Sequence, residues 1–345
     1  MGNRVAVIGA GSWGTALAIL LANKGCNVSI WGRRKEQLEI MIETRENKEY
    51  LPGVDLPSNI NITWDLEKCL FKNDFIIVVV PSHAMREVIC LITNFISDNS
   101  IIISASKGLE VNTLSRMTEV IKEELPENLH RNIAVISGPS HAEEVSRGLP
   151  AAVVTAAFTK EIAEKVQDLF ITSRFRVYTN PDIIGVELGG ALKNIIALGT
   201  GISDGLEFGD NSRAGLMTRG IAEITRLGNA MGADSLTFLG LSGVGDLIVT
   251  CGSMHSRNRR AGILIGQGKT VDEVFSILNM AVEGIRTTKA AYNLQKKYDT
   301  EMPITTELYK VLFESKTPLE ALETLMGRTR KHEIEEVARQ KLWNW

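Results

Sequence analysis

Residues 5–14 read Val-Ala-Val-Ile-Gly-Ala-Gly-Ser-Trp-Gly, an apolar run that ends in a glycine-rich turn. Gly9, Gly11 and Gly14 have the spacing GxGxxG, and a helical pattern follows from Thr15. In this context the first glycine permits a tight turn, the second lets a phosphate approach the backbone, and the third lets helix and strand pack closely. N–H groups at the helix N-terminus then face the phosphates. The stretch therefore predicts a strand–turn–helix unit that binds a dinucleotide.

The first half of the chain repeats this alternation of strand and helix. Short β-branched runs between turn residues predict strands at 5–8, 28–31, 75–80, 101–104, 133–136, 153–154 and 175–178. Helical patterns lie between them at 15–23, 35–44, 85–95 and 114–125. Strands that are apolar at successive positions are covered on both faces. We therefore expect an α/β fold of the Rossmann type, with a doubly wound, mostly parallel sheet.

The second half has little strand signal. Helical patterns occupy residues 184–202, 218–231, 273–278, 287–295 and 306–312. The chain is long enough for two domains, so we expect a Rossmann domain at 1–182 and an all-α domain at 183–345. The charged stretch 327–345 is expected to form a peripheral helix or tail.

The composition of the chain excludes several classes of partner. A net charge of −3 gives no reason to expect nucleic acid or an anionic membrane. The four cysteines have neither CxxC pairing nor metal-ligand spacing, and no His/Cys/Asp/Glu cluster indicates a metal. The longest purely aliphatic run, residues 76–80, is too short to cross a bilayer. We expect a cytoplasmic protein with no metal, no nucleic-acid partner and no membrane partner.

The segment after the second strand bears on the choice of cofactor. An NAD-selective site usually carries an acidic residue there, which binds the ribose 2′-hydroxyl. This chain instead has Arg33 and Arg34, which suit a 2′-phosphate. The alternative is a solvated basic turn. We therefore expect NADPH/NADP to be used at least as well as NADH/NAD.

Further motifs follow the later strands and helices. They are Ser-Ala-Ser-Lys-Gly-Leu-Glu at 104–110, Ser-Gly-Pro-Ser-His-Ala-Glu-Glu at 137–144, Gly-Gly-Ala-Leu-Lys-Asn at 189–194, Leu-Ser-Gly-Val-Gly-Asp-Leu at 241–247 and Ser-Arg-Asn-Arg at 256–259. In this order, over essentially the whole chain, the motifs resemble NAD(P)-dependent sn-glycerol-3-phosphate dehydrogenase of the bacterial type. The resemblance implies a Rossmann domain followed by a 6-phosphogluconate-dehydrogenase-like helical domain. It also implies a homodimer that reduces dihydroxyacetone phosphate to sn-glycerol 3-phosphate, the backbone of phospholipids.

Lys193 can also be interpreted directly, because it lies in a strongly apolar helix. An unpaired buried lysine is costly, so we expect it to be paired or to have a lowered pKa. Such a lysine can give a proton to the alkoxide that forms as hydride reaches a carbonyl. Gly189, Ala197 and Gly201 lie on the same side of the helix, which lets a cofactor or a neighbouring helix approach. The alternative is a lysine that extends to the surface.

The resemblance assigns roles to individual residues. The residues that it implies are catalytic are Lys193, the general acid/base, with Asp246 and Lys107. Those implied to bind the substrate are Lys107, Gly138, Ser140, Lys193, Asp246, Ser256, Arg257 and Asn258. Those implied to bind the cofactor, together with the glycine turn, Arg33 and Arg34, are Ser12, Trp13, Lys107, Ala142, Arg257, Ala281 and Glu283.

Several of these residues have a plainer interpretation. An aspartate after Val-Gly, such as Asp246, is more often a turn or N-cap residue. Arg257 begins a run of basic residues that would also suit an exposed helix face. His83 and His141 are alternative acid/base candidates, but the family pattern favours the lysine, so we expect both histidines to line the site at most.

Two other functional classes remain open. A hydroxy-acid or hydroxyacyl-CoA dehydrogenase of the same architecture would need a carboxylate or thioester site, against which the motifs at 138–144 and 256–258 argue. A nucleotide-sensing regulator that binds NAD(P)H without turnover would not need Lys193. Such a regulator would usually carry a nucleic-acid-binding segment, and the sequence shows none.

Overall fold

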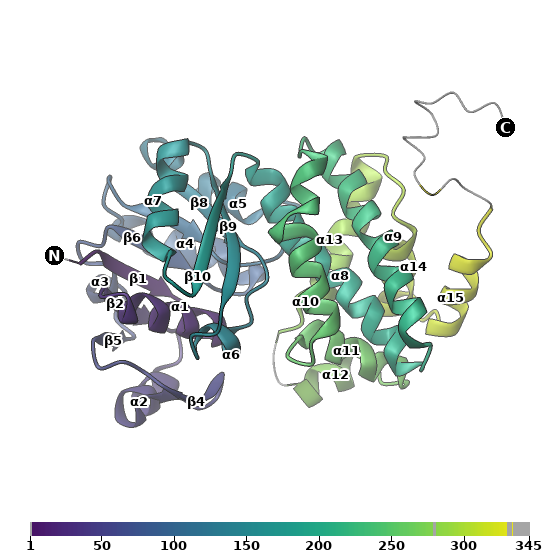
Figure 1. The fold of residues 1–345 in the computed structure, drawn as a ribbon, viewed down its shortest axis with the longest axis horizontal. Coiled ribbons are helices and arrows are strands. Elements are labelled where there is room, and N and C mark those ends of the chain that lie inside the picture. Colours follow the sequence, from purple (N-terminus) through teal and green to yellow (C-terminus); the bar gives the residue numbers. More distant parts are fainter. Residues whose placement is uncertain (1, 279–280, 330–332, 334–345) are drawn as a thin grey trace.

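The computed structural model describes residues 2–278, 281–329 and 333. Figure 1 shows two halves side by side, one built around a sheet (purple to teal) and one built of helices (green to yellow). The N-terminus lies at the outer end of the sheet half. This arrangement confirms the expected α/β architecture with a helical second half.

The sheet has eight strands in the order β10-β9-β8-β7-β6-β1-β2-β5. All neighbouring strands are parallel except β8 and β9. The strands are β1 (Arg4–Ile8), β2 (Asn27–Trp31), β5 (Ile60–Thr63), β6 (Phe75–Val78), β7 (Ile101–Ser104), β8 (Ile133–Ser137), β9 (Ala151–Ala157) and β10 (Phe175–Asn180). A separate hairpin joins β3 (Glu46–Asn47) to β4 (Leu51–Asp55).

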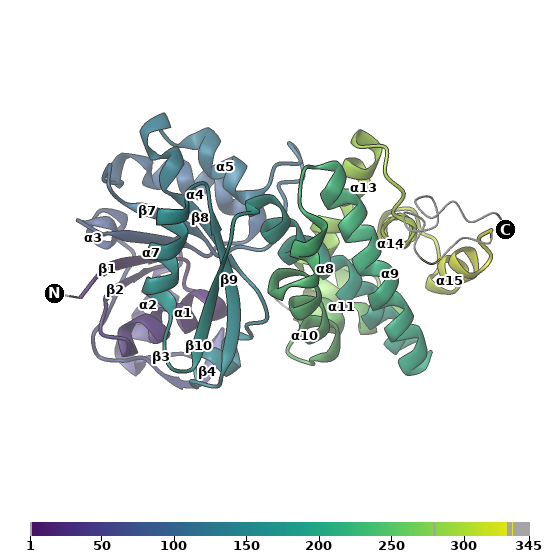
Figure 2. The same cartoon turned by 45° about the horizontal axis from the view of Figure 1, so that its top comes forward.

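Helices cover both faces of this sheet, as Figure 2 shows from a tilted direction. Val5 and Val7 of β1 belong to one apolar core, and Ala6 and Ile8 belong to another. The first core contains residues of α1 (Ser12–Asn23), α2 (Lys35–Thr44), α6 (Ala142–Val145) and α7 (Lys160–Phe170). The second contains residues of α3 (Leu66–Leu70), α4 (Met85–Ile92) and α5 (Met117–Glu124). Burial on both faces explains why the strands are apolar at successive positions.

The second half is organised around α8 (Ile183–Gly205), which is almost entirely buried. Its apolar length would suit a membrane span, but 94% of the most apolar window is buried inside the fold, as in a core helix. Around it lie α9 (Gly209–Ala230), α10 (Asp246–Gly252), α11 (Arg257–Gly266), α12 (Val271–Leu278), α13 (Glu283–Lys297), α14 (Pro303–Phe313) and α15 (Pro318–Met326). A Cβ on Gly201 would lie 2.1 Å from the Arg259 carbonyl oxygen. Because Gly201 has no side chain, α11 can approach α8 closely at this position.

Some predicted boundaries are wrong by a few residues. The strand expected at 75–80 ends at Val78, and the helix expected at 85–95 ends at Ile92, before a short 3₁₀ turn. The helix expected at 114–125 begins only at Met117, because Leu114 has a φ of +66° that a helix cannot include. Most of the tail expected at 327–345 lies outside the described residues.

The sequence interpretation missed β3, β4 and β5. Strand β5 is an edge strand of four residues in which Ile60 and Ile62 are the buried members. Two apolar positions give too short a pattern to be recognised. Its pairing with β2 fixes it instead.

Candidate active site

The turn after β1 brings backbone groups to the carboxyl edge of the sheet. Gly9 has a φ of +126°, and a Cβ there would lie 2.2 Å from the Val79 carbonyl oxygen. A Cβ on Gly14 would lie 1.9 Å from the Gly9 carbonyl oxygen, so the helix packs directly on the turn. Nothing lies within 4 Å of the same position on Gly11. Because α1 begins at Ser12, its first N–H groups have no carbonyl partner in the helix and can bind a phosphate.

Two side chains that the sequence did not single out hold this turn. Asn47 Nδ2 donates to the Ala10 carbonyl oxygen at 3.0 Å and to Thr15 Oγ1 at 2.7 Å. Gln37 Nε2 donates to the same carbonyl at 2.8 Å. Asn47 lies in the missed hairpin, so no sequence signal linked it to the turn. Trp13 Nε1, by contrast, is buried beside the turn without a partner among the described residues, which leaves a donor for a ligand.

Arg33 and Arg34 follow β2 as expected but have different surroundings. Arg34 Nη2 lies 2.6 Å from Glu49 and donates to the Tyr50 hydroxyl at 3.0 Å. Arg33 is exposed, and no hydrogen bond or ion pair joins it to another described residue. Glu49 offsets the charge of Arg34, so Arg33 is the freer of the two guanidinium groups.

Lys193, Lys107 and Asp246 meet although they lie far apart in the sequence. Lys193 Nζ donates to Asp246 Oδ1 at 2.7 Å and also to the Thr250 hydroxyl. Lys107 Nζ donates to Asp246 Oδ2 at 2.7 Å. Lys193 is 5% exposed and Asp246 is 1% exposed. Lys193 therefore does not extend to the surface, and Asp246, the first residue of α10, bridges two lysines.

The environment tunes both members of the buried pair. Burial lowers the pKa of Lys193 from 10.5 to about 8, against the opposing effect of Asp246, and the positive charge of Lys107 lowers it further. Burial alone would raise the pKa of Asp246, but the two lysines outweigh it and hold that pKa below its ordinary value. Lys193 can therefore give up and regain a proton near neutral pH, while Asp246 stays ionised. Thr250, four residues after Asp246 on α10, was missed, although its helical spacing could have revealed it.

The turn after β8 lies next to this cluster. Gly138 has a φ of +133°, and its carbonyl oxygen accepts from Lys107 Nζ and from Ser140 Oγ, each at 2.9 Å. Ala142 is buried and begins α6, which packs against α1. The turn thus connects the lysine cluster with the first helix of the sheet half.

Ser256, Arg257 and Asn258 form the start of α11. Ser256 is the N-cap, and its hydroxyl accepts from the Arg259 N–H at 3.2 Å. Arg257 is exposed, with no hydrogen bond to another described residue. Asn258 is buried: its Nδ2 donates to Asn194 Oδ1 at 2.8 Å, next to Lys193 along α8. A helix N-terminus with a free guanidinium group is a suitable anion site.

Glu283 and Ala281 lie where α13 begins. The Glu283 carboxylate accepts from the Ser82 N–H at 3.1 Å and from the Ser82 hydroxyl at 2.7 Å, which joins the two halves. A Cβ on Gly108 would lie within 3.0 Å of both side chains. The contact between Ser82 and Glu283 therefore lies beside the segment that carries Lys107. Ala281, which precedes α13, is partly buried.

Neither alternative histidine bonds to the buried pair. Burial lowers the pKa of His83, and Arg286 and Arg33 lower it further. His141 precedes α6, and its Nε2 atom is buried without a partner among the described residues. The groups hydrogen-bonded to Asp246 are Lys107, Lys193 and Thr250, and neither histidine is among them.

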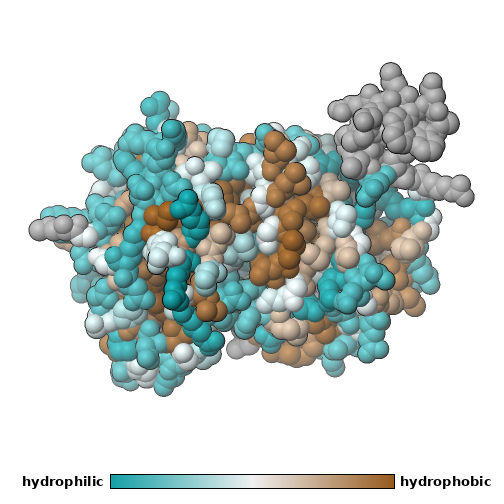
Figure 3. Space-filling view, viewed as in Figure 1, coloured by the Kyte–Doolittle hydropathy of each residue, from teal (hydrophilic) through white to brown (hydrophobic). Residues whose placement is uncertain are grey.

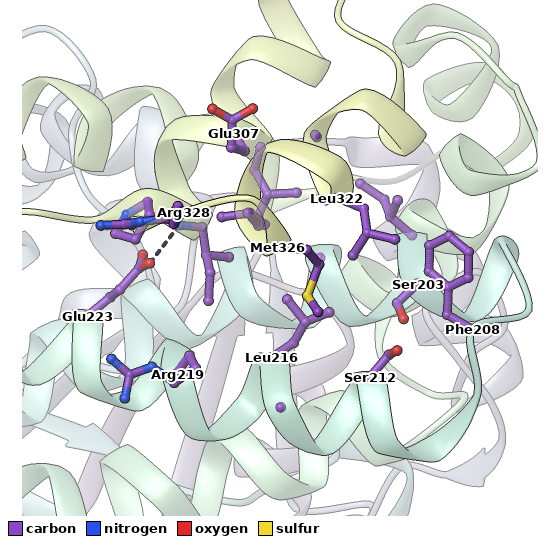
Figure 4. Close-up of a pocket in the computed structure, with 18 of the residues that line it drawn as sticks. Ser203, Phe208, Ser212, Leu216, Arg219, Glu223, Glu307, Leu322, Met326 and Arg328 are labelled. Atoms are coloured by element: carbon purple, nitrogen blue, oxygen red, sulfur yellow. Dashed lines mark hydrogen bonds between the residues drawn. The ribbon is translucent and has the colours of Figure 1, made fainter. Parts of the chain in front are cut away.

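A cavity of about 770 Å³ lies apart from this site, within the helical half. Figure 4 shows Leu216 on α9 facing Leu322 and Met326 on α15, with Glu223 beneath Arg328. None of the predicted site residues lines this cavity.

The chain matches two family models. Residues 4–163 match the N-terminal model of NAD-dependent glycerol-3-phosphate dehydrogenase, and residues 182–323 match the C-terminal model. Together the two models cover most of both halves.

Individual relatives agree with these models. The chain is 57% identical, over 98% of its length and 97% of the relative, to a protein of Pelotomaculum thermopropionicum named glycerol-3-phosphate dehydrogenase (NAD(P)+). It is 53% identical to a relative of the same name from Bacillus licheniformis, over 97% of each chain. The crystal structure of glycerol-3-phosphate dehydrogenase from Coxiella burnetii matches with a TM-score of 0.91 and 39% identity, over 95% of this chain and 99% of that one. The protein belongs to the family of NAD(P)-dependent glycerol-3-phosphate dehydrogenases.

Proposed function

We propose that the protein reduces dihydroxyacetone phosphate to sn-glycerol 3-phosphate with NADPH or NADH, reversibly. The observation that carries this proposal is the buried Lys193–Asp246–Lys107 cluster, which joins the two halves beside a dinucleotide-binding turn. The names of the relatives supply the substrate. Hydroxy-acid dehydrogenation and cofactor sensing without turnover fit this cluster and these relatives less well.

The residues present fit a nicotinamide dinucleotide. The open backbone at Gly11, the first N–H groups of α1 and the unpaired Trp13 Nε1 offer donors to its phosphates. Ala142 lies on α6, which packs against α1, and Glu283 lies beside the segment that carries Lys107, with Ala281 two positions before it. These positions support their roles beside the cofactor. When bound, the reduced cofactor supplies the hydride.

Lys193 then acts as the general acid. Its ammonium group gives a proton to the carbonyl oxygen of the substrate, and in the reverse direction its amine takes the proton back. Asp246 holds the ammonium in place, and Lys107 adds a second positive charge where negative charge develops on that oxygen. A pKa of about 8 suits both directions near neutral pH.

The phosphate of the substrate binds at the start of α11. Arg257 supplies a guanidinium group, and Ser256 and Asn258 supply polar groups at the same helix end. Gly138 and Ser140 border the substrate from the sheet half, through the carbonyl that also holds Lys107.

Consumption of NADPH in the presence of dihydroxyacetone phosphate tests the function. We expect turnover by the native protein and a kcat lower by about 10²–10⁴-fold for Lys193→Ala. Circular dichroism and NADPH binding check that the variant is folded. An inactive native protein, or a folded variant with full activity, would contradict the proposal.

The wider setting is proposed from the same family membership. We place the domain boundary between residues 182 and 183, which is supported by the end of β10 at Asn180 and by the separate apolar cores of the two halves. We also propose a cytoplasmic homodimer that supplies phospholipid synthesis. A strip of hydrophobic residues on the helical half (Figure 3) and the exposure of Leu236, Leu239 and Ile248 support a second copy as partner. Light scattering of the purified protein would give its mass.

A further inference from the structure

His141 has an unmet hydrogen-bonding group next to the candidate site. Its Nε2 atom is buried and has no partner among the described residues. A buried polar group without a hydrogen-bond partner destabilises the fold. The position of His141 in the turn that also holds Gly138 and Ser140 suggests that a ligand supplies the missing partner.

A second histidine faces His141 from the other half of the molecule. The ring centroids of His141 and His255 lie 5.7 Å apart, with the rings inclined by 56°. His255 directly precedes Ser256, the N-cap of α11, and Arg257. His141 of the sheet half therefore lies near the start of α11, where the helix N-terminus and Arg257 can bind an anion.

The charges around His141 keep the free imidazole neutral. Burial lowers its pKa, and Lys193 on α8 and His255 lower it further. Glu143 and Glu144, on α6, oppose this effect without cancelling it. A neutral imidazole still has one N–H donor, and a nearby dianion raises its pKa.

We propose that His141 is a substrate-binding residue that donates an imidazole N–H to the phosphate of dihydroxyacetone phosphate and takes up a proton as the phosphate binds. The inference rests on the proposed function and adds a contact from the sheet half, opposite Arg257. The pyrophosphate of the cofactor is the other phosphate near this turn, because α6 packs against α1. The experiment must therefore separate substrate binding from cofactor binding.

Two substitutions at His141 separate the effect of the proposed hydrogen bond from the effect of the proton uptake. His141→Phe removes both, whereas His141→Gln keeps an amide donor that cannot titrate. His130→Gln is the matched control, since its ring bonds to the Leu125 carbonyl oxygen at 2.9 Å on the sheet half. We expect His141→Phe to raise the KM for dihydroxyacetone phosphate about tenfold or more, the loss of a hydrogen bond to a charged group. The KM for NADPH and the value of kcat should change by less than about threefold, and His141→Gln should have a smaller effect on KM.

Calorimetry supplies a readout that general damage would not reproduce. sn-Glycerol 3-phosphate is titrated into the protein with NADPH present, near neutral pH, in two buffers of different ionisation enthalpy. We expect the native protein and His130→Gln to take up more protons on binding than either His141 variant. Equal proton uptake by all four proteins, an unchanged KM for the substrate, or an equal rise in both KM values would each overturn the inference. Failure of the proposed function would show differently, as a native protein that does not turn over.

Discussion

Lys193 shows how the surroundings of a single residue change its acid–base properties. Its ammonium group is buried in an apolar helix, where an unpaired charge would be costly. Asp246 and Thr250 supply the hydrogen bonds that make this position tolerable. Burial and the nearby Lys107 nevertheless bring the pKa to about 8, so the same residue can act as an acid and as a base.

At this scale Arg257 can be tested against a neighbour in the same helix. Arg257→Ala should raise the KM for dihydroxyacetone phosphate about tenfold or more, because a guanidinium–phosphate contact is lost. Arg260→Ala, also exposed on α11, is the control and should change KM less than twofold. Steady-state rates with unphosphorylated dihydroxyacetone complete the comparison. An equal loss for that compound would exclude a phosphate role for Arg257.

The two arginines after β2 should differ in their effect on the cofactor. Arg33→Ser should lower kcat/KM for NADPH relative to NADH by about tenfold, because Arg33 is the freer guanidinium group. Arg34→Ser should have a smaller effect, since Glu49 already engages that side chain. The two cofactors are compared at saturating substrate. If the ratio of kcat/KM for NADPH to that for NADH were unchanged in both variants, neither arginine would contribute to cofactor recognition.

At the scale of elements, α14 depends on a carboxylate from α9. Glu223 accepts hydrogen bonds from the N–H groups of Ile304 at 2.6 Å and Thr305 at 3.1 Å, in the first turn of α14. Figure 4 shows Glu223 reaching toward this turn at the edge of the cavity. Burial is the largest influence on Glu223 and raises its pKa from 4.5 to about 7, against these hydrogen bonds.

The raised pKa of Glu223 predicts a pH dependence of stability. The Glu223 carboxyl binds its proton more tightly in the folded state than in the unfolded chain. The stabilisation from protonated Glu223 is therefore present below about pH 4.5 and is lost as the pH rises to about 7. The loss amounts to about 3 kcal/mol. Urea unfolding of the native protein, Glu223→Gln and the exposed control Glu314→Gln measures this. The unfolding free energy of the native protein should fall relative to that of Glu223→Gln over this interval; parallel curves would contradict the assignment.

At the scale of the whole molecule, hydrogen bonds and ion pairs between polar side chains connect the sheet half to the helical half. Glu187 on α8 is ion-paired with Arg116 and accepts from the Thr118 N–H at 2.8 Å, in the first turn of α5. Lys107 reaches Asp246, and Ser82 reaches Glu283, across the same junction. These contacts hold Lys107 and Lys193, which come from different halves, at the carboxylate of Asp246.

Glu187→Ala should therefore destabilise the protein by about 3–5 kcal/mol, because Arg116 would stay buried after losing a partner. Glu49→Ala breaks the exposed pair with Arg34 and should cost less than about 1 kcal/mol. Thermal and urea unfolding measure both variants. A cost for Glu187→Ala no larger than that for Glu49→Ala would show that the junction does not depend on this pair.

The local sequence was sufficient to predict the glycine turn, most strands of the sheet and the buried helix α8. The physical reasons are short-range: the φ of +126° and the close backbone contact at Gly9 exclude a side chain there, and burial on both faces of a strand requires apolar residues at successive positions. The edge strand β5 was missed because its few buried residues leave no periodic signal. The family resemblance supplied Asp246 and Arg257, which pattern alone would have assigned to a turn and a basic helix face.

Only the tertiary structure decided how these residues act together. Lys107 and Asp246 are 139 positions apart, so no local pattern could show that one carboxylate holds two lysines. Likewise, Asn47 supports the glycine turn, Glu49 engages Arg34, and His141 faces His255 through contacts between distant segments. The pKa of Lys193 follows from burial and from those neighbouring charges, which exist only when both halves of the chain have folded against each other.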